Sequence, residues 1–356
     1  MLVIDGSYGE GGGAVLRNSL SLSTVLGQET RIENIRAGRP NPGLQAQHLT
    51  AVLALARICH AELDGAELTS QTLTFRPRCP PRSGEYSWDV AAARKGGSAG
   101  ATTLIFQAVL PPLLLAEGTS RLMLKGGTHV AWSPPFHYAQ SVYLPTLRRV
   151  GVRARVQIEQ WGWYPKGGGL ITAEIEGAAT DLSTRDGLQA EERGSLKRVW
   201  GISAISNLPE HIAQRQKAQV TRVLGAEGLA PEIEIVYAPA LGQGTLVFLV
   251  AEFQHATAGF TSLGRKGKPA ERVADEACEQ FLRYDRSGAA LDQHLADQLI
   301  IPLSLVQRSS AFTTCRISQH LLTNAWIAQQ FLDREVIIEG VEGKPGRVTI
   351  PGRSDV

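Results

Sequence analysis

The sequence predicts a protein of the α/β (α+β) class, with a large domain of three stacked βαβαββ modules and a smaller inserted α/β domain. Two observations predict it. The same order of strands and helices occurs twice between residues 2 and 175, and again at the C-terminal end. Residues 194–287 interrupt the third copy with a different pattern. We therefore expect residues 1–193 and 288–356 to form the large domain and residues 194–287 to form the insert.

The first module opens with an apolar strand at residues 2–5, a glycine-rich loop and a helix at residues 13–26. A strand at residues 30–35 follows, and then a second helix. We expect that helix to begin at Pro42, because proline suits the first helical turn and apolar positions from Leu44 to Ile58 recur at helical spacing. Short strands near residue 62 and at residues 72–75 complete the module.

The second module repeats this order. A strand at residues 86–91 and the glycines at 96, 97 and 100 precede a helix through residues 104–109. A strand at 120–125, a helix from Pro134 to Arg149 and strands at 152–158 and 170–175 follow. The third copy has a strand at 312–316, a helix at 318–331 and strands at 336–339 and 347–350. Repeats of roughly 80–90 residues exceed solenoid periods, so stacked modules are favoured over an array.

The insert has its own pattern. Strands are expected at residues 199–206, 233–237 and 246–253, and helices at residues 212–223 and 270–284. Polar segments at residues 183–187 and 285–288 resemble domain boundaries.

Composition excludes several classes of protein. The net charge of +2 is too small to attract nucleic acid over a distance, so RNA would have to be bound through local contacts. Four cysteines form no CxxC pair, which favours reduced thiols over a zinc ribbon or a disulfide framework. The apolar run at residues 104–115 contains Gln107, Pro111 and Pro112 and is too short to span a bilayer. We expect a soluble, cytoplasmic protein that does not interact with membranes.

The first candidate site is the loop Gly9-Glu10-Gly11-Gly12-Gly13-Ala14. It matches G-x-G-x-x-A, but residues 5–8 separate the strand from the first glycine, and Glu10 would repel a pyrophosphate. Main-chain N–H groups at a helix start, together with a carboxylate, better suit a phosphate bridged by a metal ion. The alternative is a glycine-rich turn with a solvent-facing glutamate. A Walker-type G-x-x-x-x-G-K-[ST] motif is absent.

The second candidate is the loop that carries Arg36 and Arg39 and ends at a helix start. A guanidinium group can bind two phosphate oxygens at once in a bidentate contact. Gly38, Pro40 and Pro42 restrict the shape of the loop. Arg17, on the first helix, could join them. The alternative is a solvated basic loop.

Two further segments carry polar residues beside apolar ones. In His294-Leu295-Ala296-Asp297-Gln298, Asp297 and Gln298 are expected at the head of a buried helix, either as a cap with surface residues or as a nucleotide-binding edge. In the segment at 318–324, His320 taken alone is more typical of a core histidine than of a catalyst. The remaining histidines show no metal-binding spacing.

Taken together, these segments resemble the RNA 3′-terminal phosphate cyclase family. The matching segments occur in family order over nearly the whole chain, at residues 5–13, 36–52, 65–71, 126–128, 164–169, 294–298 and 320–324. The chain departs from the family at Gln319, where bacterial relatives often carry cysteine, and within residues 94–100. Neither change removes a chemically required group.

The resemblance implies modules like the C-terminal domain of translation initiation factor three, and it implies a role for each site residue. His320 would be the adenylated nucleophile and Glu10 the residue linked to a divalent metal, Mg²⁺ or Mn²⁺. Pro134 or Pro135 would contact the nucleotide. The resemblance places around ATP the residues Gln107, Pro134, His294, Leu295, Ala296, Asp297 and Gln298, and at the RNA 3′-phosphate the residues Arg17, Arg36, Arg39 and Gln47.

The implied reaction converts an RNA 3′-terminal phosphate to a 2′,3′-cyclic phosphate through enzyme-histidine-AMP and RNA-(3′)pp(5′)A intermediates. One alternative is a non-catalytic, RNA-binding relative acting in ribosome assembly, which lacks the histidine. Another is an enolpyruvyl-transferase-like enzyme, which also stacks βαβαββ modules but uses more of them. The sequence leaves open whether the protein forms a homodimer, which metal it prefers and what the insert binds.

Overall fold

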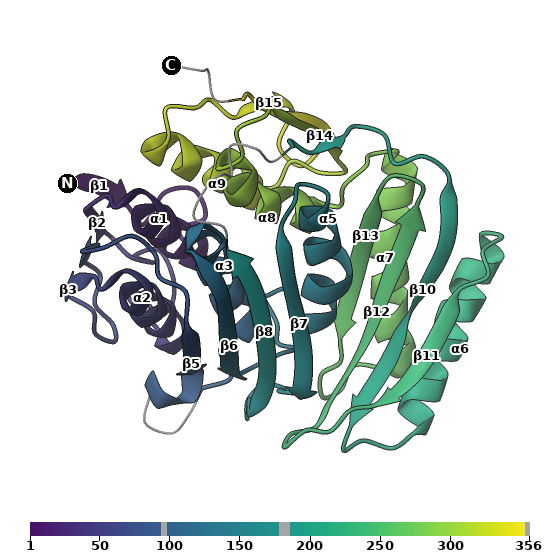
Figure 1. Ribbon diagram of the computed structural model, residues 1–356. Helices are drawn as coiled ribbons and strands as arrows, with labels where there is room; N and C mark the ends of the chain where they lie inside the picture. Colours follow the sequence, from purple (N-terminus) through teal and green to yellow (C-terminus); the bar gives the residue numbers. More distant parts are fainter. Residues whose placement is uncertain (94–97, 178–185, 353–356) are drawn as a thin grey trace.

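The computed structural model describes residues 1–93, 98–177 and 186–352 (Figure 1). It contains helices and mixed sheets throughout, so the predicted α/β class is confirmed. Two of the predicted glycines, Gly96 and Gly97, lie outside the described residues, and so does most of the boundary segment at 183–187. Among the described residues, no helix is both long enough and apolar enough to cross a membrane.

Three four-stranded sheets share one strand order. With the strands of each sheet numbered in chain order, the first pairs with the second in parallel. The second pairs antiparallel with the fourth, and the fourth pairs antiparallel with the third. In spatial order the sheets are β1 (Leu2–Asp5), β2 (Thr30–Glu33), β4 (Leu73–Arg76) and β3 (Glu62–Asp64); β5 (Glu85–Asp89), β6 (Gly118–Gly126), β8 (Gly169–Gly177) and β7 (Arg153–Gln160); and β9 (Gln189–Ala190), β14 (Ser310–Thr314), β16 (Gly346–Ile350) and β15 (Ile337–Gly340).

Helices from the different modules pack on one another at the centre of the large domain. In the first module α1 (Gly13–Leu26) packs against α2 (Ala46–Cys59). It also packs against α3 (Thr102–Leu115) of the second module and α9 (Gln319–Phe331) of the third. Figure 1 shows the purple N-terminal module beside the yellow C-terminal one. Residues far apart in the sequence therefore meet where α1 and α9 begin.

The start of α2 differs from the prediction. The helix begins at Ala46 rather than at Pro42, with Gln45 as its N-cap. The reason is that the preceding main chain is bonded elsewhere: Gly43 N–H donates to the Ile35 carbonyl and Leu44 N–H to the Ser70 carbonyl. Residues 42–45 therefore belong to the loop.

The helix predicted from Pro134 to Arg149 is present in three parts. These are α4 (Phe136–Tyr138), a π-helical stretch at residues 139–143 and α5 (Leu144–Arg148). The third module continues with α8 (Gln293–Ser304), which packs against α9.

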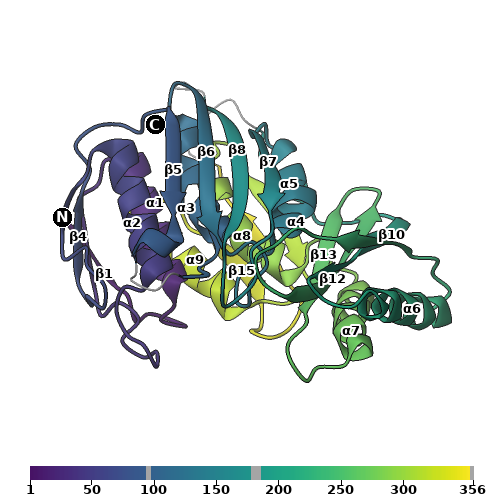
Figure 2. The same cartoon turned by 90° about the horizontal axis from the view of Figure 1, so that it is seen from below.

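The insert lies at one side of the large domain (Figure 2). Its sheet has the order β11 (Glu232–Tyr237), β10 (Leu196–Ser206), β12 (Gly244–Phe253) and β13 (Thr257–Leu263). The helices α6 (His211–Ala226) and α7 (Ala270–Ser287) pack on this sheet and enclose its own apolar core. The strands β9 and β13 were not predicted. Since β9 precedes the insert and pairs with β14, the insert interrupts the third module between β9 and α8; the division at residues 194 and 287 stays a prediction.

The insert is tied to the large domain by hydrogen bonds between buried groups. The Asp292 carboxylate, which precedes α8, accepts from the Tyr138 hydroxyl at 2.7 Å and from the Gly259 N–H of β13 at 3.2 Å. Trp163 Nε1 donates to Ser206 Oγ at 2.8 Å. In Figures 1 and 2 the insert lies beside β7 and α5.

Candidate active site

A cleft of about 2210 Å³ lies between the large domain and the insert. Its wall on the large-domain side includes residues of α1, α3, α8 and α9, and its opposite wall comes from the insert. The predicted site residues that line it are Arg17, Gln107, Pro134, His294, Asp297, Gln298 and His320. The fold therefore collects in one cavity residues that the sequence distributes over three modules.

His320 lies in the first turn of α9 and faces Glu10. The Ser318 hydroxyl caps the helix by accepting from Leu321 N–H at 3.0 Å. The His320 side chain is 53% exposed, and its Nδ1 forms an ion-pair contact with the Glu10 carboxylate, which is 14% exposed. This hydrogen bond raises the pKa of His320 above its ordinary value. Because Nδ1 holds its proton against the carboxylate, the neutral imidazole has its lone pair on Nε2, the nitrogen that can act as a nucleophile.

The glycine loop is shaped by its contact with α9. Gly9 and Gly11 have φ values of 61° and 54°, in the left-handed region that glycine adopts without strain. A Cβ at Gly9 would overlap the Thr323 hydroxyl of α9. The loop therefore packs onto α9 and carries Glu10 to His320. Glu10 therefore does not face solvent, as the alternative interpretation expected, and its role at a metal ion stays a prediction.

A metal ion at Glu10 would depend on ligands from the substrate. Among the described residues no group of three or more His, Cys, Asp or Glu side chains could hold a metal ion. Mg²⁺ is commonly bound by one or two carboxylates together with phosphate oxygens and water. The Glu10 carboxylate could supply one such oxygen, although Arg39 Nη2, 3.9 Å from its Oε2, competes with a metal cation for that oxygen.

A cluster of positive and neutral donors lies beside the glycine loop. Arg39 Nη2 donates to the Glu10 carbonyl at 2.7 Å. Burial lowers the pKa of Arg17 to about 10, which leaves the guanidinium charged at neutral pH. Burial, with the charges of Arg17 and Arg36, lowers the pKa of His48 to about 3, so this imidazole is neutral. Guanidinium groups and a neutral N–H donor in this arrangement suit a phosphate dianion.

His48 is the residue that the sequence analysis missed as a functional group. Its Nδ1 accepts from Gln45 N–H at 3.2 Å, so the neutral ring carries its proton on Nε2. A Cβ on Gly13 would overlap Nε2 and lie 2.6 Å from Arg17 Nη1. Both donors therefore face the main chain at the start of α1. The one sequence signal was a histidine at a buried position of the second helix.

Arg36 and Gln47 hold the surrounding loops. Arg36 Nη1 donates to the carbonyls of Asn41 at 2.5 Å and Gly43 at 3.1 Å. The Gln47 side-chain Oε1 accepts from Ala101 N–H at 3.1 Å, which ties α2 to the second module. Their predicted role at the RNA end stays a prediction.

The segment 294–298 differs from its expected place on the helix. The residue that caps α8 is Asp292, so Asp297 and Gln298 lie in the second turn and not at the head. Asp297 is 8% exposed and lines the cleft, and its carboxylate accepts no hydrogen bond from the described residues. Burial raises its pKa well above the ordinary value. A buried carboxylate without a partner suits a ligand that donates hydrogen bonds, such as a ribose hydroxyl.

The other predicted nucleotide residues lie around Asp297. Gln107 Nε2 donates to Gln298 Oε1 at 2.5 Å, which joins α3 to α8. The Pro134 carbonyl accepts from the Thr103 hydroxyl at 2.7 Å. His294 is exposed at the cleft. The side chains of Leu295 and Ala296 are fully buried in the core, so contact with a nucleotide would have to come from their main-chain atoms.

Asn324 links α9 to α8 and to α1 through hydrogen bonds of its side-chain amide. Its Nδ2 donates to the Asp297 carbonyl at 2.8 Å, and its Oδ1 accepts from Asn18 Nδ2 at 2.8 Å. Three helices of the cleft wall are thereby linked through one amide.

Comparison with known proteins agrees with this geometry. The family model described as RNA 3′-terminal phosphate cyclase matches residues 8–338. The chain belongs to this family. Its assignment as an enzyme of the RNA 3′-terminal phosphate cyclase family, made from the sequence motifs, is therefore confirmed.

Individual relatives carry the same name. A protein of Methylococcus capsulatus named RNA 3′-terminal phosphate cyclase is 51% identical over 99% of this chain and 97% of its own length. Proteins of that name from Gloeothece citriformis and Pyrococcus furiosus are 46% and 39% identical, over 93% and 98% of each chain. Among solved structures, the enolpyruvyl transferase NikO from Streptomyces tendae is 14% identical with a TM-score of 0.28, and covers 51% of this chain and 33% of its own. That similarity is too low to indicate a shared fold.

Proposed function

We propose that this protein uses ATP to convert an RNA 3′-terminal phosphate into a 2′,3′-cyclic phosphate through a covalent adenylate on His320. The observation that supports the proposal most is the pairing of His320 Nδ1 with Glu10, which directs Nε2 away from the carboxylate. Asp297 and Gln298 lie along the same cleft, and a guanidinium and imidazole cluster adjoins Glu10.

In the first step, Nε2 of neutral His320 attacks the α-phosphorus of ATP. The new N–P bond replaces the bond to pyrophosphate, which leaves with its electron pair. The Nδ1 proton stays at Glu10, and the carboxylate stabilises the positive charge that develops on the imidazole. A divalent metal, Mg²⁺ or Mn²⁺, when bound at Glu10, would neutralise charge on the leaving pyrophosphate.

In the second step, an oxygen of the RNA 3′-phosphate attacks the phosphorus on His320, and Nε2 leaves as a neutral imidazole. Arg17, Arg39 and the Nε2–H of His48 would orient the attacking phosphate. In the third step, the adjacent 2′-hydroxyl attacks the 3′-phosphorus and breaks its bond to AMP, and the departing AMP phosphate takes up the hydroxyl proton. Ring closure is fast because the nucleophile is held beside the phosphorus.

Two measurements test the proposal. The protein should gain the mass of AMP after mixing with ATP and a divalent metal, and His320→Ala should lose that label while keeping its fold. An RNA with a 3′-phosphate but a 2′-deoxy terminal ribose should accept AMP and then stall, so the adenylated end accumulates. Absence of labelling would favour a non-catalytic RNA-binding protein. Release of AMP from the 2′-deoxy RNA at the normal rate would exclude ring closure by the 2′-hydroxyl.

The cellular setting proposed for this activity is the cytoplasm. ATP and RNA ends are available there, and the four cysteines are free thiols, as expected in a reducing compartment.

A further inference from the structure

Trp132 is the most unusual residue of the cleft wall. It lies in the loop between β6 and α4, and its side chain is 99% exposed. Its φ of 64° is in the left-handed region, which a bulky residue rarely adopts. An exposed indole on a strained main chain contributes little to folding. Such outliers are typical of residues that contact a ligand.

A second exposed aromatic ring lines the same cleft. Tyr164, in the loop between β7 and β8, is 76% exposed, whereas the preceding Trp163 is buried and bonded to the insert. Lys166 in that loop is exposed, and its Nζ reaches the Leu241 carbonyl of the insert at 3.4 Å. The loop is therefore anchored by Trp163 and presents Tyr164 and Lys166 outward.

The insert contributes two positive charges to this cleft. Arg265 and Lys266, in the loop between β13 and α7, are exposed, and among the described residues neither has an ion-pair partner. Nearby basic side chains are already neutralised. Arg215 forms a two-point contact with Glu271 at 2.7 Å. Only part of the basic surface of the insert is therefore available to a ligand.

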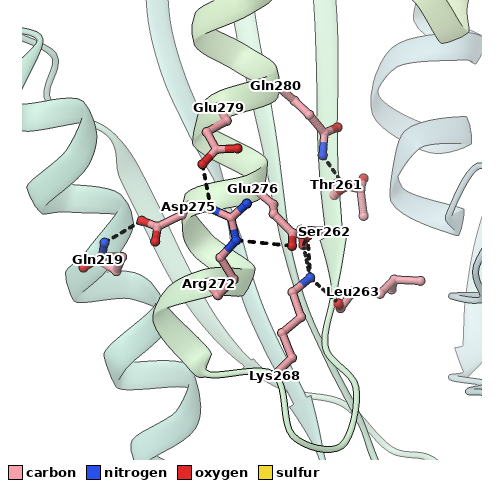
Figure 3. Close-up of polar contacts among 10 residues, drawn as sticks. All are labelled: Gln219, Thr261, Ser262, Leu263, Lys268, Arg272, Asp275, Glu276, Glu279 and Gln280. Atoms are coloured by element: carbon pink, nitrogen blue, oxygen red, sulfur yellow. Dashed lines mark hydrogen bonds and ion pairs between the residues drawn. The ribbon is translucent and has the colours of Figure 1, made fainter.

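Lys268 holds this loop in place. Figure 3 shows its side chain directed back toward Glu276 and Ser262, with Nζ at 2.5 Å from Glu276 Oε2 and 2.9 Å from Ser262 Oγ. At the other end of the loop, Gly264 N–H donates to the Thr245 carbonyl at 2.7 Å. A loop fixed at both ends presents Arg265 and Lys266 to the cleft.

We propose that these residues form a track for single-stranded RNA, which binds the nucleotides upstream of the 3′-phosphate. The track consists of Trp132, Tyr164, Lys166, Arg265 and Lys266, and it lines the cleft that His320 also lines. Exposed rings stack on bases of any sequence, and interleaved cations bind the phosphates between them. This assignment rests on the proposed function and gives the insert a role in holding the body of the substrate.

The first test removes the two charges of the insert. Direct binding of a 12-nucleotide single-stranded RNA with a 3′-phosphate is measured by fluorescence anisotropy, for wild type and for R265A/K266A. We expect roughly tenfold weaker binding, and a slope of log K against log salt that is shallower by about 1.4, since each lost phosphate contact on a single strand removes about 0.7. Adenylation by ATP and use of a dinucleotide 3′-phosphate should not change.

The control variant removes the same number of positive charges from parts of the insert that do not line the cleft. Lys217 on α6 and Arg283 on α7 are exposed, and neither lines the cleft. K217A/R283A should bind the 12-nucleotide RNA like wild type. Equal losses in both double variants would show that only overall charge matters and would overturn the track.

Trp132→Gly separates binding from stability. Glycine accepts a φ of 64° without strain, so the melting temperature should stay equal or rise. Binding of the long RNA should fall roughly tenfold through lost stacking, and Trp132→Phe should retain part of it. If Trp132→Gly bound RNA as tightly as wild type, the assignment would be overturned. Loss of adenylation in this variant would also overturn it, because the indole would then contact ATP rather than RNA. Because RNA binding is measured directly, the two proposals can fail separately. A wild-type protein that binds RNA but forms no cyclic phosphate would refute the proposed function and leave the RNA track standing.

Discussion

Replacing Gly13 with alanine would test whether the cluster at the start of α1 binds the RNA phosphate. The new Cβ would overlap His48 Nε2 and lie 2.6 Å from Arg17 Nη1. Ordinary van der Waals contact is about 3.5 Å or more, so one or both donors must move by about 1 Å. His48 is buried in close-packed surroundings and has little room to do so.

The expected effect on activity is large and the effect on stability is small. Each lost charge-assisted hydrogen bond to phosphate would cost about 1.5–3 kcal/mol, or roughly 10- to 150-fold in rate. Overpacking would lower the free energy of unfolding by about 1–3 kcal/mol. Because Gly13 is the first residue of α1, alanine's advantage in helix propensity, about 1 kcal/mol in a helix interior, offsets only part of that loss. Gly13→Ala should therefore fold and yet be a poor enzyme.

The assay separates two half-reactions. Enzyme-AMP is formed with labelled ATP, freed of nucleotide and mixed with RNA carrying a 3′-phosphate, and transfer is followed in a single turnover. Gly13→Ala should be adenylated at close to the wild-type rate and transfer AMP at least tenfold more slowly. Gly12→Ala is the matched control, since its Cβ would lie 3.2 Å from Arg39 Nη2 and 3.5 Å from Glu10 Cδ, where small shifts suffice. Wild-type transfer by Gly13→Ala, or equal loss of both half-reactions, would refute the assignment.

Three further outcomes follow from the same contacts. Glu10→Ala should slow adenylation strongly and Glu10→Asp less, as judged by AMP labelling at low Mg²⁺; two variants that behave like wild type would reduce the loop to a structural turn. Arg39→Ala should slow transfer of AMP to RNA at least tenfold, the cost of one charge-assisted contact. Asp292→Asn should lose the Gly259 hydrogen bond but keep its cap. Because burial raises the pKa of Asp292 above 3.8, wild-type stability should fall relative to Asp292→Asn as pH rises through that raised value, which thermal unfolding at a series of pH values would measure.

Periodicity in the sequence was sufficient to predict most elements of the fold. The helix at residues 13–26 and the helix near 318–331 agree with α1 and α9 within two residues. The two missed strands explain what periodicity cannot supply. β9 has two residues and therefore no pattern. β13 is rich in small residues, so its sequence shows no clear alternation of apolar and polar side chains. Without β9, the third module lacked its first strand in the prediction.

The site was predictable only in part, because some of its groups acquire their function from tertiary contacts. His320, Glu10 and the arginines belong to motifs that can be recognised in order along the chain. His48 on its own is one histidine on a helix, and nothing local indicates that Gly13 and Arg17 approach its Nε2. The exposure and positive φ of Trp132 are likewise properties of the folded loop.

The position of the insert explains how a cleft could be added without disturbing the pairing of His320 with Glu10. His320 and Glu10 meet where the first and third modules pack, and that contact depends on Gly9 lacking a Cβ against Thr323. The insert enters between β9 and α8, so it leaves this contact intact. Its return point is Asp292, which caps α8 and holds Gly259 of the insert. Asp292 therefore holds both α8, which carries Asp297, and the strand β13 of the insert, which contributes to the opposite wall of the cleft.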